Sequence, residues 1–168
     1  MKAEKAEVYA ASHLGFTAEG RLYYRRELLP KLRKAGVRIN DPWRELLRYD
    51  EEIIVDRLNP ITKELGLKIG RKNFSMIDRS DAVFACLNGT DVDSGTSTEI
   101  GYAYAKGKKI IAYRDDLRLT GDSPEIPVNL QVATAIYLSG GDIYGSLEDA
   151  AVALENMIPE LLKSRIRA

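Results

Sequence analysis

The sequence predicts an α/β fold built on a mostly parallel β-sheet, and two observations support this class. The strand-like segments are short, continuous apolar runs, which suit parallel strands covered by helices on both faces. Segments with helical periodicity separate these runs, and such alternation produces parallel sheets. We therefore expect a flavodoxin-like or Rossmann-like three-layer sandwich with about five strands, formed by residues 1–168 as a single domain.

The strands are expected where the apolar runs lie. A brief run follows Gly36, and the others are five to seven residues long, which is the usual length of a strand. The five candidate strands are Glu7–Ser12, Val37–Asn40, Ala82–Leu87, Lys109–Tyr113 and Val132–Leu138.

Helices are expected between and after these strands. Proline interrupts helices because it lacks an N–H group and clashes with the preceding turn. Pro30 should therefore kink or split the first helix, and Pro159 should bend or end the last one. The five helical segments are Ala18–Ala35, Glu45–Leu65 (with a break at Asn59-Pro60), Gly70–Ser80, Thr96–Lys106 and Ser146–Arg167.

Composition excludes several kinds of function. Lys plus Arg equals Asp plus Glu at 25 each, and the tyrosines form no stacking stripe, so neither a nucleic-acid partner nor an anionic membrane is expected. No signal peptide and no membrane-spanning run is visible, which predicts a cytoplasmic protein. With Cys86 as the sole cysteine and His13 as the sole histidine, an intrachain disulfide and the usual zinc sites are excluded. We expect Cys86 to be a buried core thiol, and the chemistry to depend on carboxylates.

Ligands of open α/β sheets bind at the carboxyl ends of the strands. Three loops follow strands in the predicted order and should therefore surround the site. They are Ser12–Thr17, Asn88–Ser97 and Arg114–Asn129.

The most informative segment, Asp91–Ala103, follows a strand and opens a helix, and it has two interpretations. In the structural one, Thr96 and Glu99 form a capping box in which each side chain bonds the other's backbone N–H. In the functional one, Glu99 is a carboxylate kept ionised by the positive end of the helix dipole and able to act as a nucleophile. With Asp93 nearby, it would form the carboxylate pair that retaining glycosyl transfer uses.

Other motifs do not fit this segment. Asp91, Asp93 and Gly95 match the start of a calcium-binding loop, but its twelfth position is Tyr102 rather than glutamate. Gly101–Lys108 lacks the spacing of a phosphate-binding Walker loop, and no G-x-G-x-x-G fingerprint follows the first strand. Nucleotide binding by these common loops is therefore not predicted, and a flavodoxin-like electron carrier is a weak alternative.

The run Asp93–Ala103 has the pattern D-x-G-T-x-x-E-I-G-Y-A, and it resembles the nucleoside 2-deoxyribosyltransferase family. The first strand with its loop, Val8–Phe16, occupies the place of the family's tyrosine-containing strand. The segments Leu28–Gly36, Asp41–Trp43 and Gly107–Arg118 continue the likeness, which covers about residues 8–140. The resemblance implies transfer of 2-deoxyribose between nucleobases, without a metal or an organic cofactor.

The resemblance also implies roles for individual residues. Glu99 would be the nucleophile, Asp93 the proton carrier to and from the base, and Tyr9 the group that orients Glu99. Asn129 would come from a neighbouring subunit to bind the 5'-hydroxyl, so at least a homodimer is expected. The residues expected around the substrate, a 2'-deoxynucleoside or free nucleobase, are Gly15, Phe16, Asn73, Asp81, Gly95, Thr96 and Asn129.

Two positions depart from the family. Asn73 stands where many relatives have an aspartate that contacts the base or sugar, so the base preference of this chain is left open. His13 stands where small residues or proline are common, and both a surface position and a role in base recognition fit it. Trp43 is expected to make a core or lid contact, although it could stack on a base.

Three functions follow from these observations. The first is a nucleoside 2-deoxyribosyltransferase that forms a covalent intermediate on Glu99. The second is a 2'-deoxynucleoside 5'-monophosphate N-glycosidase on the same fold, which would need a phosphate pocket made by serine, backbone amides or arginine. The third is a nucleotide-binding module without turnover.

Overall fold

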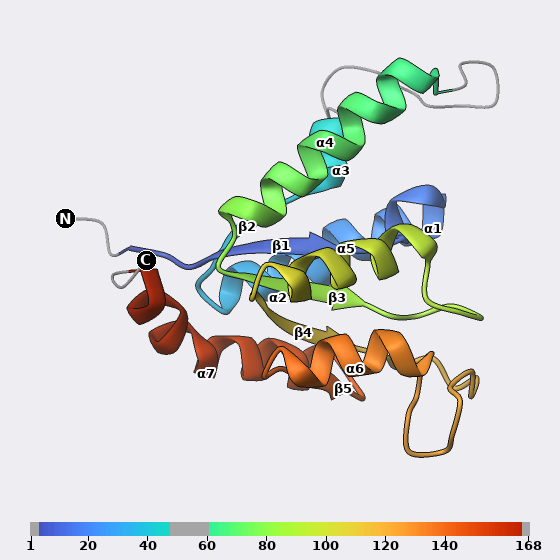
Figure 1. Cartoon of the computed structure of the whole chain (residues 1–168), viewed down its shortest axis with the longest axis vertical. Helices are drawn as coiled ribbons and strands as arrows, with labels where there is room; N and C mark the ends of the chain where they lie inside the picture. Colours follow the sequence, from blue (N-terminus) through green and yellow to red (C-terminus); the bar gives the residue numbers. More distant parts are fainter. Residues whose placement is uncertain (1–3, 48–60, 166–168) are drawn as a thin grey trace.

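The fold was analysed in a computed structural model, which describes residues 4–47 and 61–165. Five strands form one parallel sheet in the order β2-β1-β3-β4-β5, which is the strand order of flavodoxin-like folds. The strands are β1 (Glu7–Ala11), β2 (Arg38–Asn40), β3 (Ala82–Cys86), β4 (Lys109–Tyr113) and β5 (Ile143–Tyr144). The predicted fold class is confirmed (Figure 1).

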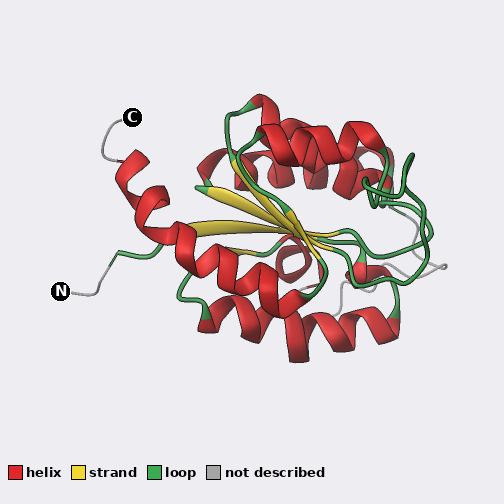
Figure 2. Ribbon diagram, turned by 90° about the horizontal axis from the view of Figure 1, so that it is seen from below, coloured by secondary structure: helices red, strands yellow, loops and turns green. Residues whose placement is uncertain are grey.

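Helices cover both faces of the sheet, as Figure 2 shows, and two apolar clusters fill the spaces between the layers. One face packs against the π-helical turn η2 (Tyr24–Leu28), α2 (Leu29–Lys34) and α7 (Leu147–Arg165). The other face packs against α4 (Lys63–Arg79), α5 (Ser94–Ala105) and α6 (Leu130–Leu138). The short elements η1 (Leu14–Phe16), α1 (Ala18–Tyr23) and α3 (Pro42–Leu47) complete the fold.

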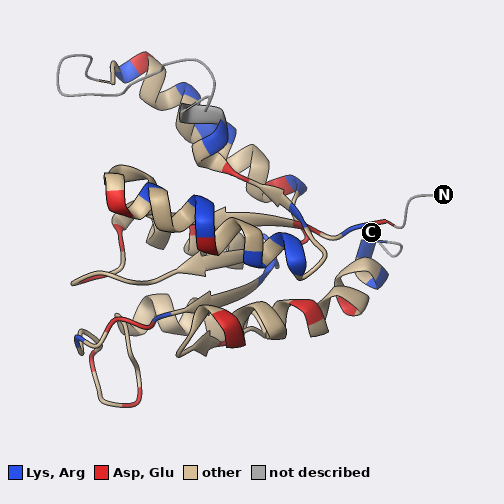
Figure 3. Cartoon of the chain, turned by 180° about the vertical axis from the view of Figure 1, so that it is seen from behind, with Lys and Arg blue, Asp and Glu red and all other residues tan. Residues whose placement is uncertain are grey.

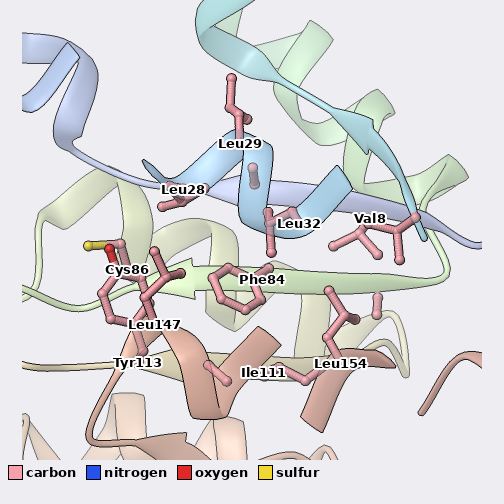
Figure 4. Close-up of a cluster of buried hydrophobic side chains, with 14 of the residues drawn as sticks. Val8, Leu28, Leu29, Leu32, Phe84, Cys86, Ile111, Tyr113, Leu147 and Leu154 are labelled. Atoms are coloured by element: carbon pink, nitrogen blue, oxygen red, sulfur yellow. The ribbon is translucent and has the colours of Figure 1, made fainter. Parts of the chain in front are cut away.

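The central strand β3 is buried along its whole length, because both of its faces are covered. Phe84 and Cys86 point to the first cluster with Ile111 and Leu154, as Figure 4 shows. Cys86 is therefore the buried core thiol expected from the sequence. Burial raises the pKa of its thiol to about 11, so the group stays protonated and packs as an apolar side chain.

The predicted strand Val132–Leu138 is wrong, because this segment forms helix α6. Asn129 caps the helix by accepting a hydrogen bond from the backbone N–H of Gln131. Ala133 and Ile136 are buried at the three-residue spacing of a helix face. The fifth strand is the two-residue β5, too short to be distinguished in the sequence.

The two prolines act differently from each other. The chain remains helical from Ala18 to Lys34, but a π-helical turn precedes Pro30, which lies at the start of α2. Pro30, which lacks an N–H group, therefore does not split the helix, and the irregularity beside it is the wider π-helical turn. Helix α7 does not end before Pro159 but continues through it to Arg165. In Figure 1 the last turns of α7 are angled away from the rest of the helix.

The helix boundaries near the site also differ from prediction. Helix α4 begins at Lys63, where Thr62 accepts a hydrogen bond from the N–H of Leu65, so 63–65 and 70–79 belong to one helix. The predicted break at Asn59-Pro60 lies outside the described residues. Within the described ranges, no helix is long and apolar enough to cross a membrane. Figure 3 shows that the positions of basic and acidic residues are interspersed along the helices.

Candidate active site

A pocket of about 260 Å³ lies at the carboxyl ends of β1 and β3, where the sequence predicted a site. The loop after β1, the start of α5 and the middle of α4 form its walls. The residues that line it are Ser12, Gly15, Phe16, Arg21, Pro42, Trp43, Ile61, Ile69, Asn73, Asp93, Gly95, Thr96 and Glu99.

The carboxyl group of Glu99 is held by residues from two other elements. The hydroxyl of Tyr9, on β1, donates a hydrogen bond to Oε1 at 2.5 Å. Nδ2 of Asn73, on α4, donates to the same oxygen at 3.4 Å. No described residue donates to Oε2. One oxygen is thus fixed by the protein, and the other remains available to a ligand.

Burial raises the pKa of Glu99 to about 7, and the charge of Asp93 adds to this effect. The hydrogen bonds from Tyr9 and Asn73 act in the opposite direction. Burial and the charge of Glu99 raise the pKa of Tyr9 far above its usual value, so the phenol stays protonated and keeps donating. The expectation that the helix dipole keeps Glu99 ionised is wrong, because the pKa of Glu99 is raised. Helix α5 begins at Ser94, so Glu99 lies beyond its first turn, where the dipole acts most strongly.

Asp93 is the N-cap of α5. Its Oδ2 accepts hydrogen bonds from the backbone N–H of Thr96 at 3.0 Å and from the Thr96 hydroxyl at 3.3 Å. The predicted capping box between Thr96 and Glu99 is therefore wrong, because Asp93 caps the helix and Glu99 bonds to Tyr9 instead. A Cβ atom on Gly95 would lie 3.0 Å from Asp93 Oδ2, so the glycine leaves room for this cap.

Part of the pocket wall is apolar and aromatic. The rings of Phe16 and Trp43 meet edge to face, with centroids 4.8 Å apart and an interplanar angle of 84°. The indole Nε1 of Trp43 donates to the carbonyl of Ser12 at 2.9 Å, which fixes the ring. A Cβ atom on Gly15 would lie only 2.0 Å from Trp43 Cδ2, so the backbone of Gly15 packs directly on the indole ring. Such a wall suits the flat, apolar faces of an aromatic ligand.

A known protein family matches most of this chain. A model of the family described as nucleoside 2-deoxyribosyltransferase matches residues 8–131. The chain belongs to this family. No curated protein matches the sequence.

Solved structures of several relatives have the same fold. A 2-deoxyribosyltransferase from Bacillus psychrosaccharolyticus is 20% identical with a TM-score of 0.62, and the match covers 87% of this chain and 90% of that one. A 2-desoxiribosyltransferase from Leishmania mexicana is 24% identical with a TM-score of 0.61, covering 90% and 97%. A CMP N-glycosidase, BcmB, from Clostridium botulinum is 19% identical with a TM-score of 0.52, covering 89% and 97%. At this level of identity the likeness concerns the fold.

The pocket brings together most of the residues predicted from the family resemblance. Seven of them line it, and an eighth, Tyr9, donates a hydrogen bond to the carboxyl group of Glu99. The loop Arg114–Asn129 contributes no lining residue. Its buried Arg114 instead donates to the carbonyls of Leu87 and Gly89, so it joins two loops.

Two predicted site residues do not line the pocket of this chain. Asp81 lies at the opposite, amino-terminal edge of the sheet, where it accepts hydrogen bonds from the backbone N–H of Glu7 and from Nε of Arg165, each at 2.6 Å. This places Asp81 in a structural contact between β1, β3 and α7. Asn129 is the exposed N-cap of α6, which leaves it accessible to another molecule.

Sequence reasoning missed several lining residues. Arg21 had no motif to mark it, although Trp43, which follows β2 and is the sole tryptophan of the chain, did carry a signal. Nη1 of Arg21 donates to the carbonyl of Gly15 at 3.0 Å. His13 lies beside the pocket, half-buried, and its Nδ1 has no hydrogen-bond partner among the described residues. Burial lowers the pKa of His13, and the charge of Asp93 opposes this effect.

Proposed function

We propose that the protein is a nucleoside 2-deoxyribosyltransferase, a pentosyltransferase that exchanges the base of a 2'-deoxynucleoside. The observation that carries this proposal is the state of Glu99. Its carboxyl lies in the pocket with one oxygen bonded to Tyr9 and Asn73 and the other open to a ligand. A fixed carboxylate with one free oxygen is suited to attack an anomeric carbon.

The reaction is expected to proceed by two inversions. Oε2 of Glu99 attacks C1' from the face opposite the base, through an oxocarbenium-like transition state, and the bond to the base breaks. Asp93 protonates the departing base and later takes the proton of the incoming base. The second base attacks the glycosyl-Glu99 intermediate and releases the carboxylate, so the configuration at C1' is retained. The two carboxyl groups carry out these steps without a metal or an organic cofactor.

The sugar and the solvent each have a predicted effect on this chemistry. A 2'-hydroxyl would crowd or engage Glu99, so deoxyribose should be preferred over ribose. Water that reaches the intermediate before the second base would hydrolyse it. The apolar wall of Phe16 and Trp43, with Ile61 and Ile69, supports the transferase because apolar side chains do not bind water and help to exclude it from the occupied pocket.

The same proposal includes an oligomer. Asn129 is exposed at the start of α6 and does not line the pocket of its own chain. We infer that it enters the pocket of a neighbouring subunit and binds the 5'-hydroxyl. Each site would then need residues from two copies, so the working unit is at least a dimer.

The second candidate function is a 2'-deoxynucleoside 5'-monophosphate N-glycosidase. It would need groups that bind phosphate, and Ser12 and Arg21 are lining residues of that kind. Asn129, an uncharged amide, favours a free 5'-hydroxyl instead, and this difference leads us to the transferase.

The test is a chromatographic assay of wild type and Glu99→Ala. Deoxyinosine is incubated with free adenine or cytosine, and a deoxynucleoside 5'-monophosphate is incubated separately without acceptor. New deoxynucleoside formed only by wild type supports the transferase and the role of Glu99. Release of free base only from the monophosphate replaces it with the N-glycosidase. No product in either reaction, with ligand binding retained in both proteins, favours a binding module.

A further inference from the structure

We propose that Arg21 reads the nucleobase, and that it selects bases with a carbonyl group over bases with an amino group at the same position. This inference rests on the proposed function, because it takes the pocket to be one for nucleobases. It gives Arg21, which lies outside the motif Asp93–Ala103, a part in specificity.

Arg21 lies in the wall of the pocket. It is a half-buried residue of α1, and among the described residues that line the pocket it is the one cation. A guanidinium has five N–H donors and no acceptor. Within the described part of the chain it makes one hydrogen bond, from Nη1 to the carbonyl of Gly15, and no ion pair. The remaining donors at the pocket therefore require acceptors from water or from a ligand.

Arg21 is attached to the aromatic part of the pocket wall. Its hydrogen bond attaches it to Gly15, whose backbone packs on the indole of Trp43 beside Phe16. This is the aromatic wall, suited to the faces of a base. The carboxyl of Glu99, which marks C1', is held instead by Tyr9 and Asn73. Arg21 thus belongs to the base end of the pocket, and we assign the edge of the base to it rather than a 5'-phosphate.

Nucleobases differ in the hydrogen-bonding groups on this edge. Hypoxanthine presents a carbonyl oxygen at position 6, and adenine presents an amino group there. The oxygen accepts a hydrogen bond from Arg21. The amino group is itself a donor and offers the guanidinium no acceptor. A hydrogen bond to a charged group contributes about 1.5–3 kcal/mol, which corresponds to a preference of roughly 10- to 150-fold.

The test measures binding without turnover. Trp43 is the sole tryptophan and lines the pocket, so its fluorescence reports ligands there, and titration calorimetry gives a second readout. Hypoxanthine and adenine are titrated into wild type, Arg21→Met and Arg21→Gln. Arg26→Met, which removes an exposed arginine near α1, is the matched control. Melting temperatures establish that each variant is folded.

Wild type and Arg26→Met should bind hypoxanthine roughly 10- to 150-fold more tightly than adenine. Arg21→Met should lose this preference through weaker hypoxanthine binding. Arg21→Gln should bind both bases about equally, because an amide can donate or accept. An unchanged preference in both Arg21 variants would overturn the inference.

A parallel comparison separates the phosphate from the base. Deoxyinosine and its 5'-monophosphate are titrated into the same proteins in a Glu99→Gln background, so that neither is consumed. If Arg21→Met weakens only the monophosphate, Arg21 binds phosphate and the inference is overturned. If the protein prefers hypoxanthine in binding but transfers no base, only the proposed function is overturned. If it transfers bases but binds hypoxanthine and adenine equally, only the inference about Arg21 is overturned.

Discussion

At the scale of the residue, Glu99 is subject to opposing influences. Burial and the charge of Asp93 raise its pKa, whereas hydrogen bonds from Tyr9 and Asn73 lower it, and the balance is about 7. Only the ionised carboxylate can attack C1'. We therefore expect kcat/KM to fall on the acid side of pH 7, by about tenfold for each further pH unit, since this parameter reports ionisation of the free enzyme. A pH profile of base exchange between pH 5 and 9 measures this, and an acid limb near 4.5 would contradict it.

The hydrogen bond from Tyr9 makes a second prediction. In Tyr9→Phe the ring still fills its buried site, but the 2.5 Å bond to Glu99 Oε1 is lost. Because this bond lowers the pKa of Glu99, the acid limb of the pH profile should move to higher pH. At pH 7 we expect kcat/KM to fall about tenfold or more, the usual effect of losing a hydrogen bond to a charged group.

Tyr104→Phe is the control for this variant. Tyr104 lies on the exposed side of α5, so its change should leave both the rate and the pH profile unchanged. If the rate of Tyr9→Phe falls equally at every pH, Tyr9 acts on something other than the ionisation of Glu99.

Glu99 also links function to stability. A raised pKa in the folded state means that its stabilising contribution is complete below the unfolded value of 4.5 and is lost as the pH rises through about 7. Above pH 7 the buried charge destabilises the fold. Glu99→Gln keeps an acceptor for Tyr9 and removes the charge, so it should raise the free energy of unfolding at pH 8.5 by up to about 3 kcal/mol. Denaturant unfolding at pH 5 and 8.5 checks this, and a gain that does not grow with pH would contradict it.

At the scale of the element, the sequence was sufficient where several signals agreed. Continuous apolar runs gave the places of β1, β3 and β4, because a buried parallel strand has few alternatives. Periodicity failed for α6, whose β-branched and apolar residues resemble a strand until the cap at Asn129 is recognised. It also misplaced the start of α5, where two candidate caps, Asp93 and Thr96, lie three residues apart.

The site was predictable to the extent that it follows a motif. Asp93 and Glu99 belong to a recognisable segment, whereas Arg21 and Ile69 reach the pocket only because α1 and α4 pack beside it. Such contacts depend on the distances between elements that are remote in sequence. The preference of Glu99 for Tyr9 over its own helix terminus is likewise a tertiary contact, between residues 90 positions apart.

The packing of the loop after β1 on Trp43 makes a prediction at the same scale. In Gly15→Ala the new Cβ would lie 2.0 Å from Trp43 Cδ2, so the ring or the loop must move. The indole would then strain its hydrogen bond to Ser12, and the aromatic wall would shift. We expect KM for the nucleoside to rise severalfold and stability to fall by about 1–3 kcal/mol, the usual cost of overpacking.

Gly70→Ala is the matched control, because a Cβ on Gly70 meets nothing within 4 Å. In the interior of α4 alanine should be neutral or stabilising, by up to about 1 kcal/mol. Steady-state kinetics and thermal melts compare the two variants. Equal effects of both on KM would show that the close approach of Gly15 to Trp43 has no functional role.

At the scale of the whole molecule, the chain places the two halves of the proposed site apart. Glu99, the proposed nucleophile, lies in the pocket, and Asn129 lies at the exposed start of α6, outside that pocket. Neither strand order nor periodicity carries information about a second copy, so the oligomer rests on the family resemblance and on this separation. The simplest arrangement that closes is a symmetric dimer in which each copy supplies Asn129 to the other.

Mixing two inactive variants tests this arrangement. Glu99→Ala lacks the proposed nucleophile, and Asn129→Ala lacks the group proposed to bind the 5'-hydroxyl. When the two are co-expressed and assemble at random, a site is intact only if Glu99 and Asn129 are each contributed by the chain that retains them. About a quarter of all sites should meet this condition, so the mixture should recover about a quarter of wild-type activity. If both groups acted within one chain, every chain in the mixture would lack one of them. The mixture would then be no more active than the separate variants. Light scattering on the same samples gives the mass of the particle, and a monomer that turns over at the wild-type rate would exclude a shared site.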